Sequence, residues 1–322
     1  MLLIEWRRAT VGCVKVSVLI PVLNGEPYVG ECLESILKQD FRDMEILIAD
    51  DGSTDGTMDT IRKYAARDER ICWWQNPRNL GQAGNHNACL RAARGEFIKF
   101  VHADDKLLQP SAVTQMVNVL ESDPAVSLVA SGAFIIDGQS RVLRIEKQLR
   151  QTGNWDGKAT IIRCLEQNGN IIGAPSRTLF RKTQAKRGFD ERYQQTLDLE
   201  MWFHLLVQGR FAYLAEPLVA YRVHSRQATA RHRQSGIGAN EPLLLLTDYC
   251  RQPWVQSRAT RRMWFKQIYN LRKINGECAK VFAADMRIHL NRFWYGIYWL
   301  EHKFFRPLAK LKNYCGRALI KF

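Results

Sequence analysis

The sequence predicts an α/β fold with a mainly parallel, Rossmann-like sheet, because short β-branched runs alternate with segments whose apolar residues have helical spacing. The run KVSVLIP at 15–21 is followed by an amphipathic segment at 27–39. The alternation continues with strands expected at 44–49, 71–74 and 97–101 and helices expected at 57–66 and 81–93. Units of this kind build parallel sheets that helices cover on both faces.

After residue 101 the pattern is looser. It predicts helices at 110–121, 160–167 and 197–208, and strands at 125–131, 133–137 and within 171–181. The polar, basic stretch at 225–238 is typical of a loop or domain boundary. We therefore expect an α/β domain at 14–238 and a basic, aromatic-rich helical appendage at 239–322.

The charge of the chain is concentrated in that appendage. The 322 residues carry a net charge of +15, and residues 241–322 hold 16 Lys and Arg against 5 Asp and Glu. Such an excess favours an anionic partner: nucleic acid, an acidic membrane surface or a phosphorylated substrate. The sequence lacks a helix-turn-helix, zinc or RNA-platform signature, so nucleic acid is not expected. An interfacial helix beside anionic lipid and a helical cap on the α/β domain both remain open.

The cysteines and the apolar segments bear on location. Eight cysteines lie scattered without a CxxC pair and are expected to be reduced. The first 20 residues lack the order of a signal peptide, and no apolar stretch reaches the ~18 to 20 residues of a membrane-spanning helix. We expect a cytoplasmic chain whose contact with the membrane, if the basic appendage makes one, is peripheral and at the inner face.

Polar residues follow three of the predicted strands, where ligands of doubly wound sheets bind. Asp104 and Asp105 follow one strand, and adjacent carboxylates repel unless a cation or hydrogen-bond donors neutralise them. A divalent Mg²⁺ or Mn²⁺ that bridges to a pyrophosphate would do so, and capping of the next helix is the alternative. Asp51 follows another strand and is free to bind a nucleobase or ribose, although its segment also suits a tight turn with Ser53 or Asp55 as a helix cap.

Three segments together resemble one family. KVSVLIPVLN, EILIADDGSTDGT and NLGQAGNHNACLRAARGEFIKFVHADD are similar, in order and spacing, to the opening half of family-2 glycosyltransferases, and the resemblance covers about 15–225. It implies a GT-A nucleotide-diphospho-sugar transferase fold, an activated sugar nucleotide, a divalent metal cofactor (Mn or Mg) and inversion at the anomeric carbon.

The resemblance also implies roles for individual residues. The matches to the nucleotide-sugar site are Pro21, Asn24, Asp50, Asp51, Asn79, Gly81, Asn87, His102 and Asp104. The metal ligands implied are Asp104, Asp105 and His224, the last from a late Y-R-x-H element. His102 departs from the family, because it stands where the first Asp of the D-x-D element is expected. It can ligate a metal, bond a diphosphate when protonated, or contact the nucleotide from a neutral ring.

On the acceptor side, Asp198 takes the position of the family's catalytic base, with Glu200 as the runner-up. Both acids also suit the first turn of a helix, where the dipole favours negative charge. Gly173 matches the acceptor-side loop, where a glycine allows close approach.

The resulting hypothesis is an inverting glycosyltransferase that moves one sugar from a UDP-sugar to a glycan or lipid-linked acceptor in cell-surface polysaccharide biosynthesis. The missing Q-x-x-R-W sequence of processive synthases favours a single addition. A sugar-phosphate nucleotidyltransferase is the alternative enzyme, but PVLNGEPY stands where its G-x-G-x-R loop is expected. A non-catalytic nucleotide-binding relative is the other alternative.

Overall fold

The computed structural model describes residues 14–255 except 168, 236, 239–240 and 251. The chain divides into two compact units, 1–245 and 246–322, and every site residue discussed below lies in the first. Most of the predicted appendage at 239–322 lies outside the described residues, so its basic, aromatic character as a helical unit stays a prediction.

A ten-stranded sheet forms the centre of the first unit, in the order β3-β2-β1-β4-β9-β6-β10-β5, with β7 on β6 and β8 on β10. Its first part is parallel and is built from β1 (Val16–Val22), β2 (Met44–Asp50), β3 (Ile71–Gln75) and β4 (Phe97–Phe100). All seven residues of β2 are buried, as expected for a strand that is covered on both faces.

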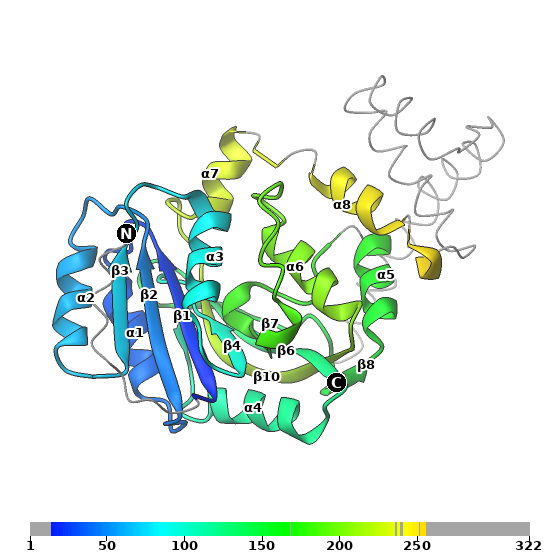
Figure 1. The fold of residues 1–322 in the computed structure, drawn as a ribbon, viewed down its shortest axis with the longest axis horizontal. Coiled ribbons are helices and arrows are strands. Elements are labelled where there is room, and N and C mark those ends of the chain that lie inside the picture. Colours follow the sequence, from blue (N-terminus) through cyan, green and yellow to red (C-terminus); the bar gives the residue numbers. More distant parts are fainter. Residues whose placement is uncertain (1–13, 168, 236, 239–240, 251, 256–322) are drawn as a thin grey trace, which may run out of the picture. The chain divides into compact units, whose positions relative to one another are not determined.

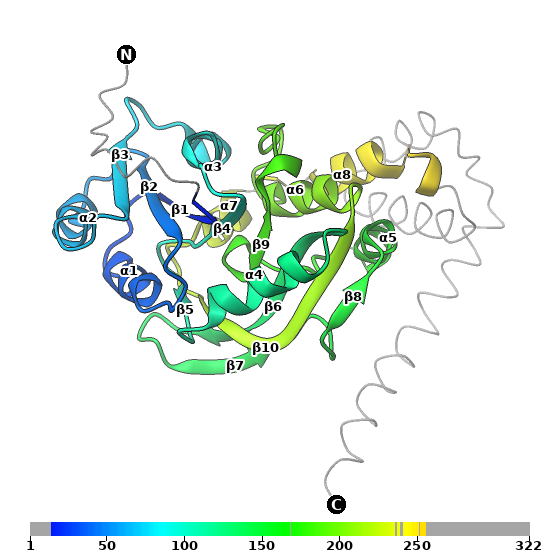
Figure 2. The same ribbon diagram turned by 60° about the horizontal axis from the view of Figure 1, so that its bottom comes forward.

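Helices cover this parallel part on both sides. Figures 1 and 2 show α1 (Val29–Leu37) and α2 (Thr57–Ala65) on one face and α3 (Gly81–Ala92) on the other. The apolar side chains of β1 and α1 share one core with those of α4 (Ala112–Ser122). The carboxyl ends of β1, β2 and β4 therefore meet at one edge, where the loops that follow them are free to bind a ligand.

The second part of the sheet is mixed. β9 (Thr178–Arg181) runs antiparallel to β4 and β6 (Val126–Ile136), and β10 (Arg210–Arg222) runs parallel to β6. The short strands β5 (Lys106–Leu107), β7 (Val142–Glu146) and β8 (Gly153–Trp155) pair antiparallel at its margins. The α/β class with its parallel Rossmann-like half is thus confirmed.

Two strand predictions were wrong for the same reason. β6 is one strand where two were expected, and β10 was missed. The register of β6 and β10 shifts around Pro217, which interrupts the apolar pattern of β10. Opposite lies Gly132, where a Cβ would lie 3.0 Å from the Ala215 carbonyl oxygen, so a side chain at this position would crowd the bulge.

The remaining helices are α5 (Gly157–Gln167), α6 (Leu197–Leu206), α7 (Ala228–Ser235) and α8 (Glu241–Cys250), with 3₁₀ turns at Pro175–Arg177, Lys182–Gln184 and Pro253–Val255. The prediction of a loop over 225–238 was wrong, because α7 lies within it. The ATARHRQS sequence of α7 has no apolar stripe, which is the feature that indicates a helix in a sequence.

Among the residues that the structure describes, no helix is both long and apolar enough to cross a membrane. Cys32, Cys72, Cys89 and Cys164 are free thiols, which agrees with the expectation of reduced cysteines.

Candidate active site

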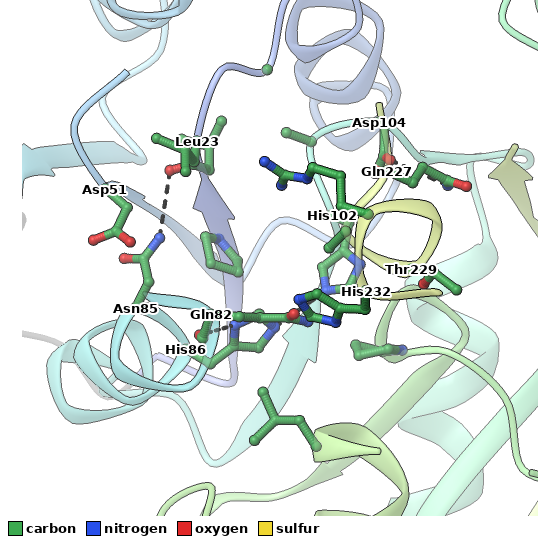
Figure 3. Close-up of a pocket in the computed structure, with 18 of the residues that line it drawn as sticks. Leu23, Asp51, Gln82, Asn85, His86, His102, Asp104, Gln227, Thr229 and His232 are labelled. Carbon is green, nitrogen blue, oxygen red and sulfur yellow. Dashed lines mark hydrogen bonds between the residues drawn. The ribbon is translucent and has the colours of Figure 1, made fainter. Parts of the chain in front are cut away.

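A cavity of about 530 Å³ opens at the edge where β1, β2 and β4 end. Its wall combines the loops after these strands, the start of α3, the start of α6 and the segment from β10 into α7. Figure 3 shows Asp51 and Asn85 on one side and Asp104, Gln227 and Thr229 on the other. The size and the convergent polar groups suit a small-molecule ligand.

Asp51 is buried in this wall and is tied to the start of α3. Its carboxylate accepts hydrogen bonds from the backbone N–H groups of Leu80 (2.8 Å) and Gly81 (3.0 Å) and from Nδ2 of Asn76 (2.9 Å). Asn79 Nδ2 donates to the Asp51 carbonyl oxygen at 3.0 Å. The predicted residues Asp51, Asn79 and Gly81 thus come together in one network, at a helix N-terminus that favours negative charge.

Asn24 and Asp50 hold the neighbouring turns. Asn24 has a φ of 53°, and its Oδ1 accepts a hydrogen bond from the Thr54 N–H at 2.9 Å. Asn24 lines the cavity together with Pro21. Asp50 is fully buried, accepts from Ser53 N–H and Gln75 Nε2, and is not part of the cavity wall that the described residues form. Its predicted contact with the donor therefore stays a prediction.

Asn87 is likewise not among the described residues that line the cavity. Its Oδ1 accepts from the Phe189 N–H at 2.7 Å, and its Nδ2 donates to the Phe189 carbonyl at 3.0 Å. Phe189 itself lines the cavity. In this structure Asn87 thus joins α3 to the loop that holds Phe189.

His102 lies in a histidine pair that fixes its tautomer. His86 Nδ1 lies 2.7 Å from the Gln82 carbonyl oxygen, which accepts only from an N–H, so the proton of His86 is on Nδ1. His86 Nε2 then accepts from His102 Nε2–H at 3.2 Å. Burial lowers the pKa of His86 to about 3 and lowers that of His102, so both rings are neutral. His102 therefore keeps the lone pair of its Nδ1.

The ligand atoms of His102, Asp104 and Asp105 lie within 4.8 Å of one another. Asp104 Oδ2 bonds His224 Nε2 at 3.1 Å, and Asp105 Oδ1 accepts from the Arg222 N–H at 2.9 Å. Asp105 Oδ2 and His224 Nδ1 are buried and have no hydrogen-bond partner within the part of the chain that the structure describes. A buried carboxylate oxygen and a buried imidazole nitrogen without hydrogen-bond partners are atoms that can bind Mn²⁺ or Mg²⁺ as ligands.

The two carboxyls of this cluster titrate in opposite directions. Burial, and then the charge of Asp104, raises the pKa of Asp105 well above its ordinary value. Burial acts against ionisation of Asp104 too, but the hydrogen bond from His224 and the nearby His102 leave its pKa lowered. The cluster therefore carries negative charge mainly on Asp104, on the side that lines the cavity.

A buried cation supports the cluster from behind. Arg222 is fully buried, donates to the Asp104 carbonyl (2.8 Å) and to Glu31 Oε2 (2.9 Å), and packs 4.3 Å from the ring centre of Tyr28. Lys99, also fully buried, donates to backbone carbonyls, and burial lowers its pKa to about 7. Neither residue was assigned a role from the sequence.

Asp198 is the carboxylate that reaches the cavity from α6. Its Oδ1 accepts from the Leu199 N–H at 2.8 Å, and its Oδ2 lies 3.4 Å from Asn170 Nδ2. Burial is the main reason that the pKa of Asp198 rises to about 6, and the charge of Glu241 adds to the rise. A carboxylate of this kind is a stronger base than an ordinary aspartate and is still ionised at neutral pH.

Glu200 and Gly173 do not line the described part of the cavity. Glu200 is buried and forms a two-fold hydrogen bond with Arg187, at 3.0 and 2.6 Å. Gly173 has a φ of 122°, and its carbonyl accepts from Trp202 Nε1 at 2.9 Å. Their predicted acceptor-side contacts stay predictions, as does the role of Asp198 as base, although Asp198 lines the cavity.

Three features thus lie at one cavity: Asp51 at the N-terminus of α3, the cluster of His102, Asp104 and Asp105, and the Asp198 carboxylate with its raised pKa. The sequence model of glycosyl transferase family 2 matches residues 17–189. The chain belongs to glycosyltransferase family 2. The family resemblance found in its sequence is therefore confirmed.

Relatives of this glycosyltransferase include the putative glycosyltransferase EpsE of Bacillus subtilis, which is 36% identical over 241 residues, 74% of this chain and 82% of EpsE. The putative teichuronic acid biosynthesis glycosyltransferase TuaG of B. subtilis is 31% identical over 215 residues, 65% of this chain and 79% of TuaG.

Solved structures share the fold. A structure of S. aureus TarS in complex with UDP-GlcNAc has a TM-score of 0.65 at 19% identity, over 86% of this chain and 77% of that one. The mannosyltransferase PcManGT of Pyrobaculum calidifontis, in complex with GDP-Man and Mn²⁺, has a TM-score of 0.57 at 17% identity, over 97% and 82% of the two chains. The expected GT-A fold of the glycosyltransferase is thus confirmed.

Proposed function

We propose that this glycosyltransferase is metal-dependent and inverting, and that it transfers one sugar from a UDP-sugar to a hydroxyl of a glycan or lipid-linked acceptor in cell-surface polysaccharide biosynthesis. The observation that carries the proposal is that Asp51, Asp104 and Asp198 line one cavity. A nucleotide, a diphosphate and an acceptor hydroxyl would need these three positions.

The nucleotide would lie against Asp51 and Asn79, with Pro21 and Asn24 beside it. A uracil base is supported by TarS, whose structures hold UDP-GlcNAc and UDP, whereas PcManGT holds GDP-Man. A polysaccharide acceptor is supported by TuaG, which is named for teichuronic acid biosynthesis.

The diphosphate would lie beside the cluster at the end of β4. Asp104, Asp105 and the Nδ1 lone pair of His102 would hold a divalent cation, with His224 adjacent. Such an ion, when bound, neutralises the charge that develops on a leaving diphosphate. Asp104 is oriented for this role by His224, and Asp105 by the Arg222 backbone.

Asp198 would act as the base. It removes the proton of the acceptor hydroxyl while that oxygen forms a bond to the anomeric carbon, and the bond from this carbon to the diphosphate oxygen breaks with its electron pair on the diphosphate. Because attack and departure occur on opposite faces, the anomeric configuration inverts. With a pKa of about 6, Asp198 is mostly ionised at neutral pH, yet it holds the proton more strongly than an ordinary aspartate.

The test is release of nucleoside diphosphate from a panel of UDP- and GDP-sugars with Mn²⁺, with and without acceptor extracts, for the wild type and for Asp198→Asn. We expect release from one UDP-sugar that depends on acceptor and is lost in the variant, although the variant still binds UDP. Release that the variant retains would contradict the assignment of the base. Tight UDP binding without release from any sugar nucleotide would favour a non-catalytic nucleotide-binding protein.

A further inference from the structure

The segment 194–196 lies between the cavity and helix α6, and a distant residue holds it. Thr196 is the N-cap of α6 but makes no capping bond with its own side chain. The carboxylate of Glu241, at the start of α8, accepts instead from the N–H groups of Gln194 (2.7 Å), Gln195 (2.8 Å) and Thr196 (2.7 Å) and from Thr196 Oγ1 (3.0 Å). Charge-assisted bonds of this kind are the strong ones, and Glu241 is 7% exposed.

We propose that Glu241 is a positioning residue of the transfer reaction. It fixes segment 194–196 and thereby orients Asp198 and Gln195, which line the part of the cavity that we call the acceptor half. This inference rests on the proposed function. Gln194, Gln195 and Asp198 all line the cavity. Gln195 Oε1 is buried without a hydrogen-bond partner among the described residues. A hydroxyl of the acceptor sugar could therefore donate a hydrogen bond to this oxygen.

The turn before α8 is shaped for this contact. Gly238 has a φ of 77°, and a Cβ on it would come within 2.4 Å of Gln195 Cβ and 2.9 Å of Glu241 Oε1. The backbone at 238 therefore packs directly against the segment that Glu241 holds. Glu241 lies outside the family match at 17–189, so it is a feature of this chain's second half.

Glu241 also acts on Asp198 through its charge. Two carboxylates then share the N-terminus of α6, and the Glu241 charge raises the pKa of Asp198 beyond the effect of burial. Within the described part of the chain, Tyr221 of β10 interacts electrostatically with Asp198, and His232 of α7 does so with Glu241. A neutral residue at 241 should therefore make Asp198 a weaker base.

The test compares Glu241→Gln with the wild type and with Glu216→Gln, a control at an exposed glutamate that bonds only Gln109 in the described structure. Glutamine has the shape of glutamate, but only one of its two terminal groups can accept a hydrogen bond. The NH₂ group would face backbone N–H donors and could not bond them. In the free enzyme we expect amide hydrogen exchange at 194–196 to accelerate at least about tenfold, because charge-assisted bonds are lost. We also expect the ¹³C carboxyl titration of Asp198 to move to lower pH.

In the transfer assay, Glu241→Gln should lower kcat with little change in UDP affinity, and the acidic limb of the pH profile should move to lower pH. Glu241→Asp keeps the charge, so it should retain the wild-type pH midpoint even if its shorter side chain restores only part of the protection of the 194–196 amides against exchange. This variant is the second one to use if Glu241→Gln does not fold. Exchange and titration of Glu241→Gln like those of the wild type would overturn the proposal. These two measurements need no turnover, so a wild type that transfers no sugar contradicts the proposed function and leaves them decisive for Glu241.

Discussion

Replacement of Asp198 by asparagine separates the role of this residue as a base from its role in the structure. Asn has the same shape, cannot take a proton and has no charge to bury. Loss of a general base lowers rates about 10² to 10⁴-fold. We therefore expect at least a hundredfold loss of kcat in Asp198→Asn, with UDP affinity unchanged because Asp198 belongs to the acceptor half of the cavity.

The pH dependence of the wild type follows from the same carboxyl. A base with a pKa of about 6 is about nine-tenths ionised at pH 7 and about one-tenth ionised at pH 5, whereas an ordinary aspartate would still be mostly ionised at pH 5. At saturating donor and metal, kcat/KM for the acceptor should thus fall about tenfold from pH 7 to pH 5. A flat profile over this range, or a variant that keeps a tenth of the wild-type rate, would refute the reasoning.

The contribution of Asp198 to the free energy of unfolding should fall with rising pH, over the same range in which the activity rises. The pKa of Asp198 in the folded protein, about 6, is raised above the ordinary value of an aspartate, so the folded protein holds this proton more tightly than the unfolded chain does. Ionisation above pH 6 therefore costs folding free energy, about 3 kcal/mol for a rise of about two units. Asp198→Asn should be more stable than the wild type at pH 7.5 by up to this amount, and the gain should vanish toward pH 4. Urea unfolding at both pH values measures it, and a variant that is less stable at pH 7.5 would contradict the buried charge.

Three further changes have distinct expected outcomes. His86→Phe removes the acceptor that fixes the tautomer of His102, so Mn²⁺ affinity, measured by calorimetry, should fall about 10 to 100-fold, and an unchanged affinity would exclude the histidine pair from the metal site. Glu200→Gln weakens the ion pair between the buried Glu200 carboxylate and the exposed Arg187, so it should cost about 1–3 kcal/mol in urea unfolding while transfer persists, and loss of transfer in a folded protein would make Glu200 the base. Asn87→Ala removes the two hydrogen bonds between α3 and the Phe189 backbone, so it should lower the free energy of unfolding by a similar ~1–3 kcal/mol and leave UDP affinity unchanged. Weakened UDP binding would instead support a direct contact between Asn87 and the nucleotide.

The parallel half of the fold and its loops could be predicted because their determinants are local. β2 shows continuous burial, and its register with β1 brings Val22 opposite Asp50, so the two loops that follow must lie side by side. The contact between Asn24 and Thr54 is a direct result. The positions of Asp51 and Asp104 at one edge follow from the same topology.

The other contributors could not be predicted because their partners are distant in the sequence or their pattern is interrupted. Glu241 reaches back 45 residues to Thr196, and nothing in its own neighbourhood indicates this. Pro217 interrupts the apolar pattern of β10, the strand that brings Arg222 to the acidic cluster. Sequence spacing likewise does not distinguish a carboxylate that reaches the cavity, such as Asp51, from Asp50, which is fully buried and is not part of the described cavity wall.

The most direct test of the account is isothermal titration of the protein with UDP and with GDP, each with and without Mn²⁺, for the wild type and Asp104→Asn. The proposed function predicts that UDP binds more tightly than GDP, that Mn²⁺ strengthens its binding, and that Asp104→Asn abolishes the effect of the metal. Absence of binding by either nucleotide under all conditions, or UDP binding that neither Mn²⁺ nor the variant changes, would contradict a metal-dependent donor site in this cavity.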